Sequence, residues 1–284
     1  MRSFVGLGVV LAALVGCAAP EEEGERAAED TSAAQSGRGP REAVFARGAV
    51  DVVVFTVLFP RARVAALLPD ALALGDVTSL GFGEDVYPVL FVVGRQIDVH
   101  AEAASMVSMS YDEAVVFVPE VRFGEGTDCV EGRAGPFLFS PAMYVADPRP
   151  WIGTSGYGYP KQLESLRSDA RSFAVGDRLE VAFRGASPLS PAGADNRARI
   201  AELASAPILG MAKGGKGYVW SFFDWNLRSA EVSSLGVSGF VRDALGDGTT
   251  VPLVFDRPGL NDGIAGAFRL QTSWSLSKAR SCPL

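Results

Sequence analysis

The sequence predicts an α+β fold that is rich in strands, with few helices and an antiparallel sheet that forms a closed or nearly closed barrel. Strand-like segments outnumber helical ones, and they do not alternate regularly with helices as in a doubly wound parallel sheet. Hydrophobic residues make up 48% of the chain, which is enough for a sizeable core. The interior of such a barrel can hold one small ligand, so we also expect a buried pocket.

Local patterns place the individual elements. Runs of β-branched, aromatic and alternating residues predict strands at 50–58, 86–93, 114–123, 179–184, 217–227, 230–241 and 267–277. Residues 61–68 have a helical pattern that stops at Pro69. The clearest amphipathic helix is expected over 195–209, where Asp195 can cap the N-terminus and Ile200 lies on the apolar face.

The first 40 residues are expected to lie outside the folded domain. Residues 1–16 combine one arginine with an apolar run that is too short to span a bilayer, and they resemble a bacterial lipoprotein signal peptide. An ordinary secretory signal is the alternative. Residues 17–40 are acidic, small and polar without an aromatic residue, which predicts a disordered linker lipidated at Cys17. Residues 41–284 then form one domain, since no second linker follows.

Such a signal predicts a protein of the cell envelope that is anchored to a membrane by its lipid alone. An aspartate directly after the lipidated cysteine would resemble a signal for retention in the inner membrane, and this chain has Ala18 at that position. We therefore expect the outer membrane, with the domain facing the periplasm.

Charge and composition limit the kinds of partner and cofactor that we expect. The formal net charge is -7, and no basic cluster is interleaved with aromatic residues, which argues against nucleic acid. His100 is the single histidine, so no metal-ligand spacing exists, and we expect neither a metal nor a cofactor. Cys129 and Cys282 remain once Cys17 is lipidated, and we expect them to form a disulfide in an oxidising compartment. A small molecule is the expected partner, and the oligomeric state is left open.

One charged residue lies in a segment of glycines and tyrosines, G-T-S-G-Y-G-Y-P-K-Q-L at 153–163. A lysine has an unperturbed pKa of about 10.4, and apolar surroundings are needed to free its amine as a nucleophile. The neighbouring aromatic rings can supply these surroundings for Lys161. If Pro160 opens a short helix, the helix dipole lowers the pKa of Lys161 further. The alternative is a glycine-rich surface turn that carries a solvated lysine.

Four segments resemble the acetoacetate decarboxylase family, in the order in which that family has them. They are F-P-R-A-R-V-A-A-L-L-P-D-A-L-A-L at 59–74, Y-D-E-A-V-V-F-V-P at 111–119, the stretch 144–153 with its Tyr, Asp, Pro and Gly, and Y-P-K-Q-L at 159–163. The resemblance implies a β-rich cone around a buried pocket. It also implies that Lys161 forms a Schiff base and that Glu113 is an active-site acid. The side chains expected to line the pocket are Tyr111, Tyr157, Tyr159 and Gln162.

The chain departs from the family pattern at three places. Thr154 and Ser155 stand where the family has Arg-Glu, and Gln162 replaces the second lysine, which lowers the pKa of the first. The active-site arginine near the start of the domain has no clear counterpart, because Val50 falls there and Arg47 is only close by. Much of the charge that tunes the lysine is therefore missing, which argues against acetoacetate itself as the substrate.

Two functions follow from these residues. The first is a lysine-dependent lyase that acts on a small oxo acid or ketone, with Lys161 as the nucleophile and Glu113 orienting the substrate or moving a proton. The second is a lipid-anchored barrel without catalysis that binds a small apolar or carbonyl ligand.

Overall fold

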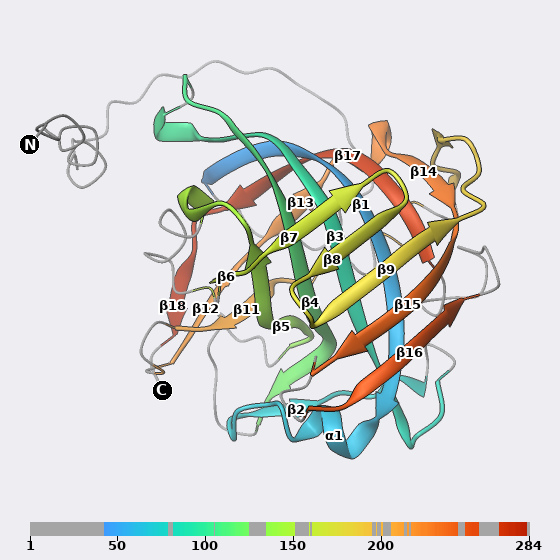
Figure 1. Ribbon diagram of the computed structural model, residues 1–284. Coiled ribbons are helices and arrows are strands. Elements are labelled where there is room, and N and C mark those ends of the chain that lie inside the picture. Colours follow the sequence, from blue (N-terminus) through green and yellow to red (C-terminus); the bar gives the residue numbers. More distant parts are fainter. Residues whose placement is uncertain are drawn as a thin grey trace, which may run out of the picture. The chain divides into compact units, whose positions relative to one another are not determined.

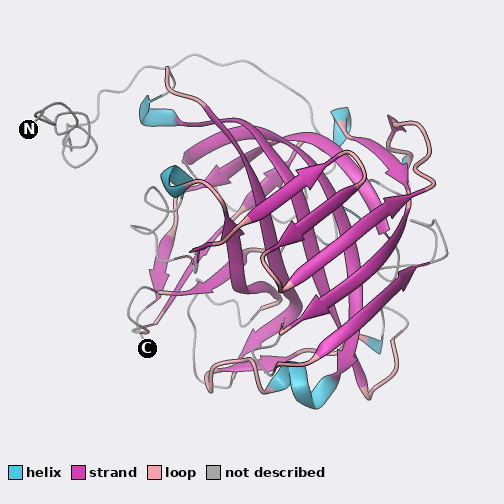
Figure 2. Cartoon of the chain, in the orientation of Figure 1, coloured by secondary structure: helices cyan, strands magenta, loops and turns pink. Residues whose placement is uncertain are grey.

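The computed structural model describes residues 43–78, 82–104, 106–124, 135–150, 159, 161–194, 197, 200, 206–212, 215, 217–243, 248–255 and 267–282. These residues belong to one unit, Glu42–Leu284. Strands dominate this unit (Figures 1 and 2). The predicted signal peptide and linker lie outside the described residues and stay predictions.

Two sheets make up the unit. The 13-stranded sheet consists of β1 (Val44–Pro60), β2 (Leu72–Leu74), β3 (Val86–Ala101), β4 (Met109–Phe123), β5 (Phe137–Val145), β6 (Lys161–Leu163), β10 (Ser190–Pro191), β11 (Ile208–Met211), β12 (Tyr218–Ser221), β13 (Phe223–Trp225), β14 (Glu231–Ser234), β17 (Ala267–Ser277) and β18 (Arg280–Cys282). The five-stranded sheet consists of β7 (Leu166–Asp169), β8 (Ser172–Val175), β9 (Leu179–Arg184), β15 (Gly236–Arg242) and β16 (Thr250–Phe255). Helix α1 (Arg61–Ala65) follows β1, and short 3-10 turns lie at Glu102–Ala104 and Leu227–Ser229.

The five-stranded sheet lies over part of the larger sheet (Figure 1), and the largest core cluster takes buried residues from both sheets. Alternate residues of β1, from Val53 to Phe59, face this cluster, together with buried residues of β8, β9 and β15 such as Phe173 and Val181. The other residues of β1, including Val50, Val52 and Val54, face a second cluster on the opposite side of the larger sheet. Both faces of the larger sheet are therefore buried, which explains its nearly continuous apolar sequence.

The expected strand-rich fold is confirmed, but the sheets do not close into a barrel. The main path of the larger sheet runs from β10 to β18. The segment Tyr218–Trp225 is interrupted at Phe222, and its first half pairs with β11 and β18, whereas its second half pairs with β17. One aromatic segment thus connects distant parts of the sheet without forming a continuous ring of strands.

The predicted elements correspond to β1, α1, β3, β4, β9, β12 with β13, β14 with β15, and β17. The expected helix over 195–209 ends too late, because Ile208 and Leu209 belong to β11. Ala194, Arg197 and Ile200 are helical, while most of that range lies outside the described residues. Ile200 is buried in the second cluster, as its place on the apolar face predicts.

Candidate active site

The side chain of Lys161 is positioned by the pairing of three strands. Lys161 is opposite Met143 in the parallel pairing of β6 with β5, and Met143 is opposite Val115 in the pairing of β5 with β4. Residues opposite each other in a sheet project to the same side. Lys161 therefore projects to the side on which Val115, Met143 and Ile208 form a small buried cluster. Glu113, two residues before Val115, projects to this side as well.

Lys161 and Glu113 form a buried ion pair. Lys161 Nζ donates a hydrogen bond to Glu113 Oε1 across 2.6 Å. The two side chains are only 7% and 8% exposed, respectively. A pair so far removed from water is held by strong charge attraction, and the loss of one partner would leave an uncompensated buried charge. The two predicted catalytic residues are thus brought into direct contact.

The ion pair sets the protonation of Lys161. Burial acts to lower the pKa of the amine, but the charge of Glu113, with Tyr111 adding to it, outweighs burial and raises the pKa above its ordinary value. The expectation of a lowered pKa is therefore wrong for the resting state. The expected helix start is also wrong, because Lys161 is the first residue of strand β6 and not part of a helix.

Two tyrosines predicted for the pocket lie beside this pair. Lys161 Nζ lies 5.3 Å from the centre of the Tyr111 ring, a cation–π distance. Burial, followed by the charge of Glu113, raises the pKa of Tyr111 to about 12. Tyr159 packs against the small cluster of Val115 and Met143, and its hydroxyl is hydrogen-bonded to the buried hydroxyl of Ser221.

Gln96 completes the described polar contacts of Glu113, and it is not part of the sequence prediction. Its Nε2 donates to Glu113 Oε2 across 3.0 Å, so Lys161 and Gln96 each hold one carboxylate oxygen. Gln96 is opposite Tyr111 in the pairing of β3 with β4. A sequence signal exists in the alternating residues after Gly94, which extend β3 beyond the predicted end at Val93.

The other predicted residues are not brought to this site. Gln162 is exposed and follows Lys161 directly in β6, so its side chain lies on the opposite face. Tyr157, Cys17 and Cys129 lie outside the described residues. Cys282 is buried and disulfide-bonded, and its pairing with Cys129 stays a prediction.

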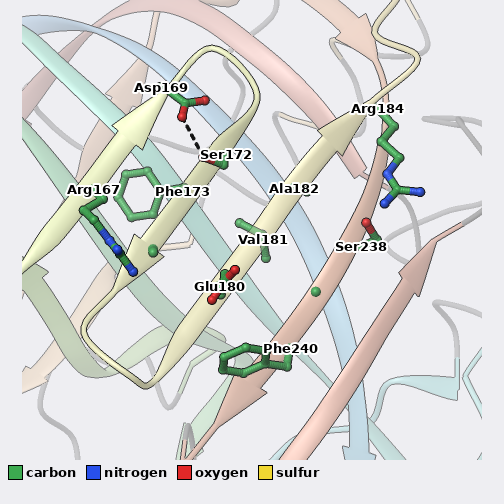
Figure 3. A pocket seen from close by; sticks show the side chains of 12 residues that line it. Arg167, Asp169, Ser172, Phe173, Glu180, Val181, Ala182, Arg184, Ser238 and Phe240 are labelled. Atoms are coloured by element: carbon green, nitrogen blue, oxygen red, sulfur yellow. Dashed lines mark hydrogen bonds between the residues drawn. The ribbon is translucent and has the colours of Figure 1, made fainter.

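A separate hollow lies on the outer face of the five-stranded sheet (Figure 3). Its lining includes the charged residues Arg167, Glu180 and Arg184, and neither Lys161 nor Glu113 contributes to it. Within the described ranges, no group of three His, Cys, Asp or Glu side chains could hold a metal ion. No helix in the described part of the chain is long and apolar enough to cross a membrane.

Solved structures share the arrangement of the strands. The enduracididine biosynthesis enzyme MppR complexed with pyruvate is 13% identical at a TM-score of 0.50, over 87% of this chain and 93% of that chain. MppR with the condensation product of pyruvate and imidazole 4-carboxaldehyde has the same identity and TM-score, over 84% and 89%. An acetoacetate decarboxylase-like enzyme from Sphingomonas wittichii RW1 is 14% identical, with a TM-score of 0.46, over 89% and 99%.

This chain has an acetoacetate decarboxylase-like fold. The resemblance read from the four sequence segments is thereby confirmed at the level of the fold. Comparisons of the sequence with known protein families and with curated proteins find no match. The acetoacetate decarboxylase-like fold establishes the frame of the site, and the activity has to be argued from Lys161, Glu113 and their surroundings.

Proposed function

We propose that the protein is a lysine-dependent enzyme that forms a Schiff base between Lys161 and a small oxo acid or ketone. The observation that carries this proposal is the buried contact of 2.6 Å between Lys161 Nζ and Glu113 Oε1. Bound pyruvate in the similarly folded MppR indicates that the fold accommodates a small oxo acid.

The ion pair is compatible with imine formation, although it keeps Lys161 protonated at rest. Glu113 first takes a proton from the ammonium, and the free amine adds to the carbonyl carbon while the carbonyl electrons move to oxygen. A proton passes from nitrogen to that oxygen, which gives a neutral carbinolamine. Glu113 then returns its proton to the hydroxyl, water leaves, and an iminium forms at Lys161. The carboxylate thus faces a cation before and after the reaction, so imine formation itself adds no net charge to the buried site.

The iminium would then act as an electron sink for decarboxylation, aldol or dehydration chemistry. Apolar neighbours such as Val115 and Met143 exclude water from the nitrogen and strengthen the attraction of Glu113. Tyr111 places its ring over the cation and favours the charged forms of the lysine nitrogen. These residues hold the cation and move its proton without a second lysine.

Borohydride trapping tests this proposal. The purified protein is incubated with pyruvate, acetoacetate and longer oxo acids, reduced, and examined by intact mass and peptide mapping. We expect a covalent adduct on Lys161 that is absent from Lys161→Ala and unchanged in Lys278→Ala, which removes an exposed lysine. Absence of an adduct with every compound would reject Schiff-base chemistry.

The second candidate is a protein without catalysis that binds a small apolar or carbonyl ligand. The raised pKa of Lys161 favours it, because a lysine held as an ammonium is a poor nucleophile. In this case, the same compounds bind reversibly, and reduction leaves the mass of the protein unchanged.

We propose in addition that Cys17 carries the lipid that anchors the protein in the cell envelope, at the outer membrane facing the periplasm. The apolar segment that ends at Cys17 supports this proposal. Metabolic labelling with a fatty-acid analogue should mark the full chain and not Cys17→Ser. Equal labelling of both would reject the anchor.

A further inference from the structure

Gln96 has one amide atom to which no group in the described part of the protein donates a hydrogen bond. Its Oε1 is buried and has no hydrogen-bond partner, and the residue is only 8% exposed. The orientation of the amide follows from chemistry, because an ionised carboxylate only accepts hydrogen bonds. Nε2 must therefore face Glu113, and Oε1 is left as the free acceptor. A buried acceptor without a partner is unfavourable and calls for a donor.

The free acceptor belongs to the surroundings of Lys161. Gln96 and Tyr111 are opposite each other in the sheet, and Gln96 contacts the same carboxylate as Lys161 does. Leu90 and Val92, which precede Gln96 on its face of β3, join the clusters on that side of the larger sheet. A ligand whose carbonyl group reaches Lys161 thus lies on the side that carries Gln96.

A second unpartnered polar atom lies on the same side. Trp274 belongs to the cluster of Val50 and Val52, stacks on Phe223, and has a buried Nε1 without a partner. Phe223 also packs against the cluster next to Lys161. Among the described residues, this side of the sheet therefore combines apolar and aromatic side chains with one free acceptor and one free donor, a composition typical of small-molecule sites.

We propose that Gln96 selects the ligand, and that the preferred ligand is a carbonyl compound that carries a hydroxyl or N–H donor for Gln96 Oε1. This inference rests on the proposed function for the role of Lys161 and deepens it by naming the substrate class. The carbonyl group meets Lys161, and a donor elsewhere in the same molecule meets Gln96. Plain oxo acids such as pyruvate and acetoacetate lack this donor and leave the acceptor unpaired.

Matched pairs of compounds test the proposal, because a methyl group and a hydroxyl group are similar in size. The pairs are 2-oxobutanoate with hydroxypyruvate, 2-oxopentanoate with 4-hydroxy-2-oxobutanoate, and 2-oxohexanoate with 5-hydroxy-2-oxopentanoate. Equilibrium binding is measured by ligand-observed NMR, and imine formation by borohydride trapping. We expect the hydroxyl member of at least one pair to bind and trap about tenfold better than its methyl partner.

The preference for the hydroxyl compound over its methyl partner, expressed as the ratio of their affinities, is then compared between variants. Gln96→Met removes the acceptor at similar size, and it also changes the support of Glu113. That second effect acts on both members and cancels in the ratio. We expect the ratio to fall to about one in Gln96→Met. It should persist in Gln96→Glu, whose carboxyl must be protonated to donate to Glu113 and still offers its other oxygen as an acceptor. Arg95→Gln, a change at the exposed neighbour in β3, should leave the ratio unchanged.

The outcomes separate this proposal from the proposed function. If no compound is trapped, Schiff-base chemistry is rejected, and the binding ratio still decides the role of Gln96. Equal binding within every pair, or a ratio that survives in Gln96→Met, would overturn the selection by Gln96. Equal binding is the result expected if an ordered water donates to Gln96 Oε1 in place of the ligand. Gln96→Met could fail to fold. In that case, the ratio in wild type and its persistence in Gln96→Glu decide whether Gln96 selects the ligand.

Discussion

Lys161 and Glu113 are 48 residues apart in the sequence, and their charged atoms lie 2.6 Å apart in the fold. Because the pair is buried, we expect Lys161→Met or Glu113→Leu alone to lower the free energy of unfolding by about 3–5 kcal/mol. The double variant should recover most of this loss, since it leaves no buried charge. Denaturant unfolding of the four proteins measures the coupling. Additive losses would show that the two residues do not depend on each other.

Alkaline pH should destabilise the protein through Tyr111 and Lys161. Both groups have a raised pKa in the folded state, so the folded protein holds their protons more tightly than the unfolded chain does. This contribution to stability is complete below the unfolded pKa values and is lost as the pH rises toward the folded ones. For Tyr111, the loss runs from 10.0 to about 12.

Unfolding experiments across this range, with wild type and Tyr111→Phe, measure the effect. The variant should lose less stability than wild type as the pH rises. Identical pH dependence in the two proteins would contradict the buried, protonated state of Tyr111.

The bond between Tyr159 and Ser221 should stabilise the wall beside Lys161. Tyr159→Phe leaves the fully buried Ser221 hydroxyl without this partner, at a cost of about 1–3 kcal/mol. Ser221→Ala should cost little more once Tyr159 is already replaced. A thermal unfolding cycle of the two single variants and the double variant checks this. Independent effects of the two changes would argue against the bond.

Gly94 lies opposite Glu113 in the sheet and has a φ of 148°. A Cβ atom at this position would lie 2.4 Å from the backbone oxygen of Asp51. Gly94→Ala should therefore destabilise the protein by more than about 2 kcal/mol. At Gly83, a Cβ would meet nothing within 4 Å, so Gly83→Ala is the matched control and should change stability by less than about 0.5 kcal/mol. Equal stability of the two variants would contradict the close approach of β1 and β3.

The sequence motifs placed Lys161 and Glu113 in one site, because each residue lies in a short segment that resembles one family, but they did not predict the ion pair between them. Gln96 could not be found in this way, since its role depends on the register of β3 against β4. The local backbone structure at Lys161 could not be predicted from the sequence either. A lysine after proline is compatible with a helix start or with an extended strand. The strand forms because Lys161 pairs with β5, a segment that is not adjacent in the sequence.

The closure of the sheet was likewise not predictable from local patterns. The segment 217–227 reads as one aromatic strand, whereas the structure interrupts it at Phe222 and pairs its halves with different partners. The partner of the second half, β17, lies far from it in the sequence, so a local pattern cannot reveal this change of partner.

The central claim is that Lys161 forms an imine and that Glu113 accepts and returns the proton during this reaction. Site mapping of the reduced adduct tests the claim most directly. The chain has four lysines, Lys161, Lys213, Lys216 and Lys278. After reduction with pyruvate or a hydroxylated oxo acid, we expect the modification on Lys161 alone, with a rate at least about a hundredfold lower in Glu113→Gln. Modification spread over all four lysines, or an undiminished rate in Glu113→Gln, would contradict the claim.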